Sequence, residues 1–211
     1  MEGILPLFPL NLVVYPGEHL KLHVFEERYK QLAEECLRGD TTFGIPTVLN
    51  QEVASVATEV KIVSVEKRYG NGELDMTTQG IRRIQISQYF PVAPNRLYPG
   101  GATERLEEQM GYDPRLMAEV KALLKDFHHA LGVQRSFDTE DPNGFSFQIG
   151  HHVGFNLQQE HRLLTLPSEH DRLLFIKDHL KQVIPIVMET ERLKARAKMN
   201  GHYKNIIPPN V

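Results

Sequence analysis

Two pairs of adjacent histidines are the residues of this sequence whose types most directly suggest chemistry. His128-His129 and His151-His152 are four of ten histidines, and neutral imidazole is a common metal ligand. Consecutive residues on a helix point about 100° apart, so neither pair can clamp one ion by itself. We expect one histidine of each pair near the core and the other in water, and a metal site only if the fold brings His128 and His151 together.

Three other positions invite a functional interpretation, and each has a structural alternative. The single cysteine, Cys36, falls on the apolar side of a predicted helix, where a buried thiol is favoured over a nucleophile. Glu26-Glu27 stand where that helix begins, and acidic side chains there stabilise the helix dipole. Arg82-Arg83 lie between isoleucines on a predicted strand. One of them should face outward and the other lean across the sheet, in a structural salt bridge or at a partner surface.

The sequence motifs of common enzyme classes are missing. The chain contains no GxxxxGK[ST] loop, no HExxH and no GxSxG, and one cysteine rules out a multi-cysteine zinc site. We therefore predict a protein that is not an enzyme, with no catalytic residues, no metal and no cofactor. An unrecognised hydrolase stays open as the least favoured alternative, because catalytic residues can meet only in space.

Composition narrows the class of partner and the compartment. The net charge of −3, from 24 basic and 27 acidic side chains, argues against nucleic acid. No apolar run approaches the roughly 20 residues of a membrane span, and the start MEGILPLFPL does not resemble a signal peptide. With one cysteine and no intrachain disulfide, we expect a cytoplasmic protein with no membrane contact. A homo-oligomer is compatible with the sequence.

The first half of the chain has the pattern of a β-rich unit with one inserted helix. Tyr15-Pro16-Gly17-Glu18 fits a type II turn, and an apolar stripe from Tyr29 to Leu37 predicts a helix. Asn-Gly at 71–72 predicts a hairpin. Pro91 and Pro94 limit residues 89–98 to an edge strand or a loop. Short strands are predicted within residues 4–10, 20–24, 43–49, 56–65, 74–78 and 81–86, a set that favours closure into a barrel.

The second half is predicted to be helical. Asp113-Pro114 and Asp141-Pro142 are N-cap and first-turn pairs, Asn156 with Gln159 predicts a cap, and Ser168 with Asp171 opens the last helix. That helix should run to about Met199. Residues 191–204 carry a net charge of +4, which we interpret as a solvated helix end, the alternative being a basic arm for an acidic partner.

Four stretches carry a resemblance that covers most of the chain. They are LPLFPL with VVYPGEHLKLHVFEERYKQL, then FGIPTVL, then NGELDMTTQGIRRIQI, and last QQEHRLLTLPSEHDRLLFIKDHL. Together they resemble the substrate-binding domain at the N-terminus of Lon-type ATP-dependent proteases. The motor and serine-lysine peptidase that follow this domain in those proteases have no counterpart among the motifs of this chain.

The resemblance implies a fold and a function. The fold is α+β, an N-terminal PUA-like pseudo-β-barrel with one inserted helix in residues 1–110, then a helical bundle ending in a long helix in residues 111–211. The function is a non-catalytic protein- or peptide-binding module, an adaptor in proteolysis or protein quality control that holds unfolded or extended segments. The alternative is a PUA-like protein that binds a small molecule or RNA.

We place the contact surface at the start of the first helix. Aromatic and arginine side chains are the usual anchors of protein interfaces, which selects Phe25, Glu27, Arg28 and Tyr29. For Tyr29, ordinary core packing is an equally strong interpretation. The Pro-rich segment near Pro91 and Pro94 is a second candidate, because an extended peptide can add to such an edge.

Overall fold

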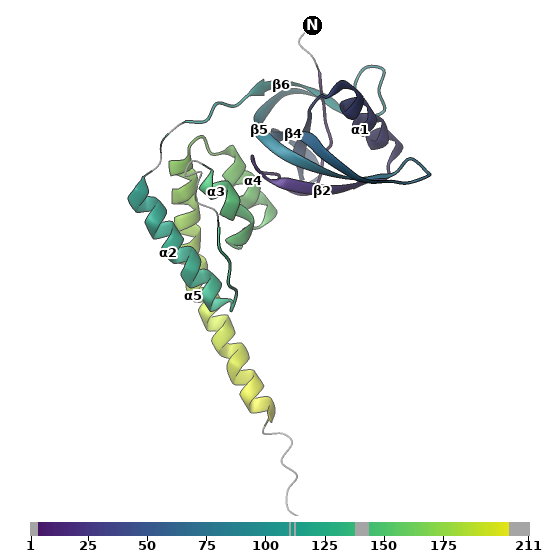
Figure 1. Ribbon diagram of the computed structural model, residues 1–211. Helices are drawn as coiled ribbons and strands as arrows, with labels where there is room; N and C mark the ends of the chain where they lie inside the picture. Colours follow the sequence, from purple (N-terminus) through teal and green to yellow (C-terminus); the bar gives the residue numbers. More distant parts are fainter. Residues whose placement is uncertain (1–3, 110, 112, 138–143, 203–211) are drawn as a thin grey trace, which may run out of the picture.

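The protein is a β-barrel with helices packed against one side of it (Figure 1). The computed structural model describes residues 4–109, 111, 113–137 and 144–202. One antiparallel sheet precedes all helices but one, which confirms the predicted α+β order. The strands are β1 (Leu5–Pro6), β2 (His19–Val24), β3 (Phe43–Leu49), β4 (Glu52–Arg68), β5 (Leu74–Phe90) and β6 (Gly100–Arg105).

Strand β5 is the central strand of the sheet, whose order is β1-β6-β5-β4-β3. Strands β2 and β6 pair with successive parts of β5, while β4 pairs with its residues 74–85. The two short strands predicted at 74–78 and 81–86 are wrong, because they form one 17-residue strand. The register shifts where Glu59 faces Arg82 and Val60 faces Gly80, so the expected interruption is a bulge inside the strand.

The sheet closes on itself at its two ends. Parallel bridges join Leu7 to Gly44 and Leu10 to Thr47, which link the segment after β1 to β3. The predicted type II turn is present, with Gly17 at φ 84° and the Glu18 amide donating to the Tyr15 carbonyl. The closed strands leave few free edges for unwanted pairing.

The helices that begin at residues 114, 157 and 169 do so where local capping chemistry predicted. The helices are α1 (Glu27–Gly39), α2 (Pro114–Ala130), α3 (Phe145–Ile149), the 3₁₀ turn η1 (Gly150–His152), α4 (Leu157–Thr165) and α5 (Glu169–His202). Asp113 accepts from the Arg115 amide, and Asn156 with Gln159 forms a complete capping box. The predicted Asp141-Pro142 start lies outside the described residues.

Helices α2 and α5 lie side by side, and α5 continues beyond α2 through Pro185 (Figure 1). In that outer part Ile186 and Leu193 are 65% and 53% exposed. Arg192 pairs with Glu189 on the same helix, and Lys194 likewise pairs with Glu191. None of the helices in the described part of the chain combines the length and the hydropathy that a membrane span needs.

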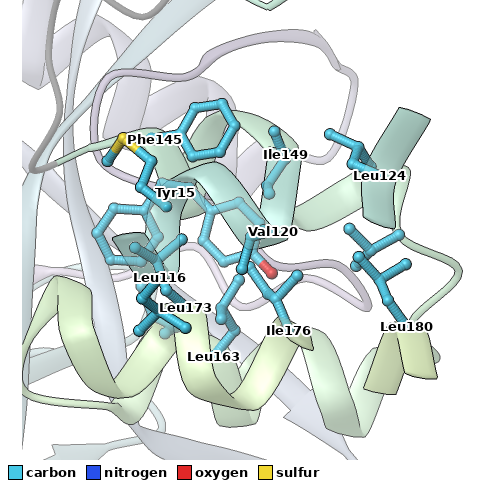
Figure 2. Close-up of a cluster of buried hydrophobic side chains, with 14 of the residues drawn as sticks. Tyr15, Leu116, Val120, Leu124, Phe145, Ile149, Leu163, Leu173, Ile176 and Leu180 are labelled. Carbon is cyan, nitrogen blue, oxygen red and sulfur yellow. The ribbon is translucent and has the colours of Figure 1, made fainter. Parts of the chain in front are cut away.

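Tyr15 joins the barrel to the helical core. Its ring lies among helical side chains such as Leu163 and Ile149 (Figure 2), and its hydroxyl donates to the Glu160 carbonyl at 3.0 Å. A Cβ on Gly150 would stand 2.6 Å from this ring. Only glycine lets the chain approach a buried ring so closely, which explains its place at this contact.

Buried charges fix the same junction. Arg83 of β5 is 4% exposed and donates to the Leu164 carbonyl at 3.1 Å and the Leu166 carbonyl at 2.7 Å. Glu108 accepts from Arg83 at 2.8 Å and from Arg172 at 2.5 Å. Of the predicted arginine pair, Arg83 is therefore the buried one that reaches the helical half, while Arg82 makes the salt bridge across the sheet, to Glu59 of β4 at 2.5 Å.

The predicted boundary at residue 110 falls in the connection between β6 and α2. This connection is only partly described, because residues 110 and 112 lie outside the described residues. Barrel residues Val13, Tyr15 and Val56 belong to the same apolar cluster as the helices. The division into 1–110 and 111–211 therefore stays a prediction, since the two parts share a core.

Candidate functional site

Helix α1 is held on the barrel by polar contacts along both of its flanks. On one flank, Lys30 donates to the Asn71 carbonyl at 3.0 Å, and Arg68 pairs with Glu34, so the tip of the β4–β5 hairpin packs against the helix. On the other flank, Gln31 accepts from the Leu97 amide at 2.9 Å. The helix thus lies between the hairpin tip and the loop that connects β5 to β6.

The four predicted contact residues separate into three exposed side chains and one core side chain. Phe25 is 59% exposed, and Glu27 and Arg28 are exposed at the first turn of α1. Tyr29 is 5% exposed and its ring stacks on Phe8 at a centroid distance of 3.8 Å. Tyr29 therefore packs in the core, which is the alternative that the sequence left open for it.

Phe25 ends a short row of aromatic side chains. Its ring centroid lies 6.0 Å from that of His23, which in turn makes an edge contact with Tyr69 at 5.8 Å. His23 is held in place because its Nδ1 lies 2.7 Å from a carboxylate oxygen of Asp75. The row presents an apolar side chain on a fixed base, the usual form of a binding anchor.

The other end of α1 borders a groove of about 1250 Å³, which we call the α1 groove. Its walls come from β1, the C-terminal half of α1 and the loop between β5 and β6. Leu5, Pro6, Ala93 and Pro94 supply apolar wall surface. Pro94 belongs to the Pro-rich segment that the sequence singled out, and Leu97 in the same loop is 60% exposed.

A polar cluster closes one side of the α1 groove. Tyr98 donates to Glu35 at 2.5 Å, and Arg96 pairs with the same carboxylate at 2.7 Å. Burial and the hydrogen bond to Glu35 raise the pKa of Tyr98 to about 12, so its phenol stays a donor at neutral pH. Arg38, at the exposed end of α1, also lines the groove.

The residues considered for chemistry do not assemble into a catalytic or metal-binding group. Burial raises the pKa of the Cys36 thiol, and this side chain is 2% exposed. His128 is buried and His129 exposed, as predicted, but the prediction is wrong for the second pair, in which His151 is exposed and His152 half-buried. His128 contacts the backbone carbonyl of His152 at 2.9 Å rather than His151. Among the residues that the structure describes, no three histidine, cysteine or acidic side chains are placed to share a metal ion.

Two features of these surfaces have no counterpart in the sequence interpretation. The cluster of Glu35, Arg96 and Tyr98 joins residues about sixty positions apart, and no local pattern reports such a pairing. A second cavity, of about 540 Å³, lies against α2 in the helical half. Its only local trace is the spacing of Lys121 and Lys125 on one side of α2.

The known proteins that this chain resembles agree with the fold described above. A family model described as the ATP-dependent protease La (LON) substrate-binding domain matches residues 4–182. Curated relatives include the Lon proteases of Azorhizobium caulinodans, 22% identical over 214 residues, and Dictyoglomus thermophilum, 23% identical over 223 residues. These matches cover 92% and 97% of this chain but 24% and 27% of the relatives, so the chain spans about a quarter of their length.

Two solved Lon N-terminal domains have the same fold as this chain. A Lon N-terminal domain protein from Xanthomonas campestris aligns with a TM-score of 0.64 and 26% identity, over 82% of this chain and 95% of that one. The N-terminal domain of Mycobacterium avium complex Lon protease aligns with a TM-score of 0.62 over 85% and 98%, at 18% identity, and shows the fold alone. The family model is named for substrate binding, and both matched structures are named as Lon N-terminal domains.

Proposed function

The chain belongs to the family of LON substrate-binding domains, and from that premise we propose that it is a non-catalytic module that binds extended segments of other proteins along α1. The observation that carries this proposal is the exposed apolar surface around that helix. Phe25, Val92 and Leu97 are 59%, 63% and 60% exposed, and the α1 groove lies beside the last two. Exposed apolar side chains gathered around a groove are typical of interaction sites.

The dimensions of α1 suit an extended ligand. Its 13 residues span about 20 Å at 1.5 Å per residue. An extended peptide covers the same distance with about six residues. Phe25 and Arg28 would contact one end of such a segment, and the α1 groove would contain the other. Tyr29 supports this surface from below through its stack on Phe8.

The wider role follows from the family. We propose that the module holds unfolded or extended protein segments for proteolysis or protein quality control, as an adaptor for a separate ATP-dependent protease. The matched family model is that of the substrate-binding domain rather than of a peptidase or ATPase. A binding surface without a catalytic group is what such a role requires.

Binding of an unfolded reporter tests the proposal. A permanently unfolded, carboxymethylated protein and its native form would be titrated with the wild type by fluorescence anisotropy. We expect the unfolded form alone to bind, and Leu97→Glu to weaken it at least about tenfold, since burying one leucine is worth about 1.5–3 kcal/mol. Phe25→Glu should have a smaller effect, because it affects one end of the surface.

The matched control is Val63→Glu, which places the same charge on another exposed apolar residue of the barrel, 42% exposed on β4. It should leave binding unchanged. Equal affinity in all three variants, or no binding of the unfolded reporter by the wild type, would count against the α1 surface.

A further inference from the structure

The second cavity, which we call the α2 cavity, lies between α2, the segment 133–137 and the first residue of α3. Leu124, Phe137 and Phe145 give it apolar walls, and its volume of about 540 Å³ is in the range of ligand-binding pockets. It belongs to the helical half of the molecule, whereas the α1 groove belongs to the barrel. The two sites therefore share no lining residue.

Cationic side chains come from two of the segments that line the α2 cavity. Lys121 and Lys125 are one turn apart on α2, about 6 Å along its axis. Arg135 belongs to the segment 133–137. Every lining residue in the described part of the chain is neutral or cationic, so no carboxylate among them balances this charge. The Lys121 ammonium instead lies 5.0 Å from the centre of the Phe145 ring.

Among the residues that the structure describes, Arg135 contacts a histidine ring and no carboxylate. Its guanidinium lies 3.2 Å and 3.3 Å from the two ring nitrogens of His152. Burial and the charge of Arg135 both lower the pKa of His152, which favours the neutral ring as the partner. Phe137, two residues on, packs against the same ring at a centroid distance of 5.4 Å. The contact with His152 thus holds the positive charge of Arg135 beside the cavity.

We propose that the α2 cavity binds an internal protein segment in which an apolar side chain is flanked by acidic side chains. The apolar side chain would contact Val133, which is 40% exposed, and Phe137, which is partly exposed. Carboxylates on either side of it would pair with Lys121 and Lys125 on one segment and with Arg135 on the other. Cations on two segments match two separated carboxylates, which a single terminal carboxylate cannot supply. The proposal rests on the proposed function only in that the ligand is a protein segment.

Short defined peptides test this site directly. A labelled pentapeptide with both ends blocked, phenylalanine at its centre and two glutamates on each side, would be titrated by fluorescence anisotropy. Its glutamine analogue and its alanine-centred analogue serve as probes of charge and of the apolar side chain. We expect the glutamate peptide to bind about tenfold more tightly than either analogue at low salt, with the advantage over the glutamine form reduced at about 0.5 M salt.

Charge reversal locates the binding site. Lys121→Glu with Lys125→Glu should abolish the preference for glutamate, and Arg135→Glu, on an exposed segment, should weaken it without touching the helix. The control pair Lys61→Glu with Lys198→Glu makes the same change in net charge at exposed positions outside the cavity. Equal binding of the glutamate and glutamine peptides, or equal loss in the control pair, would overturn the proposal.

The two binding proposals can fail separately. Leu97→Glu leaves the α2 cavity intact, so the glutamate peptide should bind this variant as it binds the wild type. Loss of unfolded-reporter binding alone would count against the α1 surface only. Peptide binding that falls with Leu97→Glu and persists in Arg135→Glu would place the acidic ligand elsewhere and overturn the assignment of the α2 cavity.

Discussion

The junction between barrel and helices and the α2 cavity both gather charged side chains, but they treat those charges in opposite ways. At the junction, Arg83 and Arg172 face Glu108 and Glu169, two cations and two carboxylates with N–O distances of 2.5–2.9 Å. In the α2 cavity, Lys121, Lys125 and Arg135 line an apolar space with no carboxylate among the described lining residues. Among the described residues, the first group is paired within the chain, while the second lines its cavity without an acidic partner.

The two groups of charges differ in what they require in order to be stable. Removing a charge from water is costly unless a partner is fixed beside it, so the buried arginines of the junction require their internal acceptors. Ser146 adds to this, because its hydroxyl donates to Glu169 at 2.6 Å and accepts from Arg172 at 2.7 Å. Lysines at the surface carry no such requirement. Their clustering on an apolar cavity costs some stability, and we propose that binding rather than folding explains it.

The largest expected effect is at the junction. Arg83→Met removes the charge that pairs with Glu108 and leaves the Leu164 and Leu166 carbonyls without this donor. We expect the free energy of unfolding to fall by about 3–5 kcal/mol, as for other broken buried pairs. Urea unfolding followed by circular dichroism measures this loss.

The neighbouring arginine is the matched control. Arg82 pairs with Glu59 at 2.5 Å, but its side chain is 40% exposed. Arg82→Met should cost less than Arg83→Met, about 2 kcal/mol, because it leaves the Glu59 carboxylate, whose side chain is 12% exposed, still bonded to Thr42. Equal losses at the two positions would break the distinction between a buried, internally paired group and a surface one.

Local chemistry explains what the sequence predicted correctly. The turn at Pro16-Gly17, the helix start at Asp113 and the capping box of Asn156 with Gln159 each depend on residues at most three positions apart. Gly80 shows where such reasoning falls short. Two short strands were expected on either side of it, yet they form one strand with a bulge at this position. Glycine is needed there because a Cβ would stand 2.2 Å from the Tyr15 carbonyl oxygen of the opposing turn.

The candidate sites were predicted only as far as single residues allow. Phe25 and Arg28 were selected by type, and their exposure agrees with a contact surface that stays a prediction. The Leu164 and Leu166 carbonyls that accept from Arg83 lie some eighty residues along the chain, and the segment that carries Arg135 meets α2 only after folding. Patterns within one element cannot report such meetings.

A second prediction concerns a titratable part of the junction. His151 lies between Glu160, 2.8 Å from its Nδ1, and Glu18, 3.2 Å from its Nε2. Burial lowers the pKa of His151, but hydrogen bonds and charge from Glu160 and Glu18 more than reverse this and raise it to about 9. Because the folded-state value lies above the ordinary 6.5, the stabilisation is complete below about pH 6.5 and is lost as the pH rises through 9.

The matched variant isolates this contribution. The difference in unfolding free energy between the wild type and His151→Gln should be greatest near pH 6 and should shrink toward pH 10, when both are measured by urea unfolding. A difference that is independent of pH would mean that His151 supports the junction by packing on Tyr15 alone, where its ring centroid lies 4.6 Å away.

The smallest expected effect on stability is in the α2 cavity, and its sign is opposite. The residues one turn from Lys125 along α2 are Lys121 and His129, so a like charge faces it on one side and a titratable ring on the other. Lys125→Glu replaces that repulsion with an attractive pair and should raise the unfolding free energy by up to about 0.5 kcal/mol at low salt. The gain should vanish in about 1 M salt, where charges are screened within about 3 Å. The same variant should bind the glutamate peptide more weakly. A loss of stability on Lys125→Glu would instead show that the lysines of the α2 cavity are structural, like the arginines of the junction.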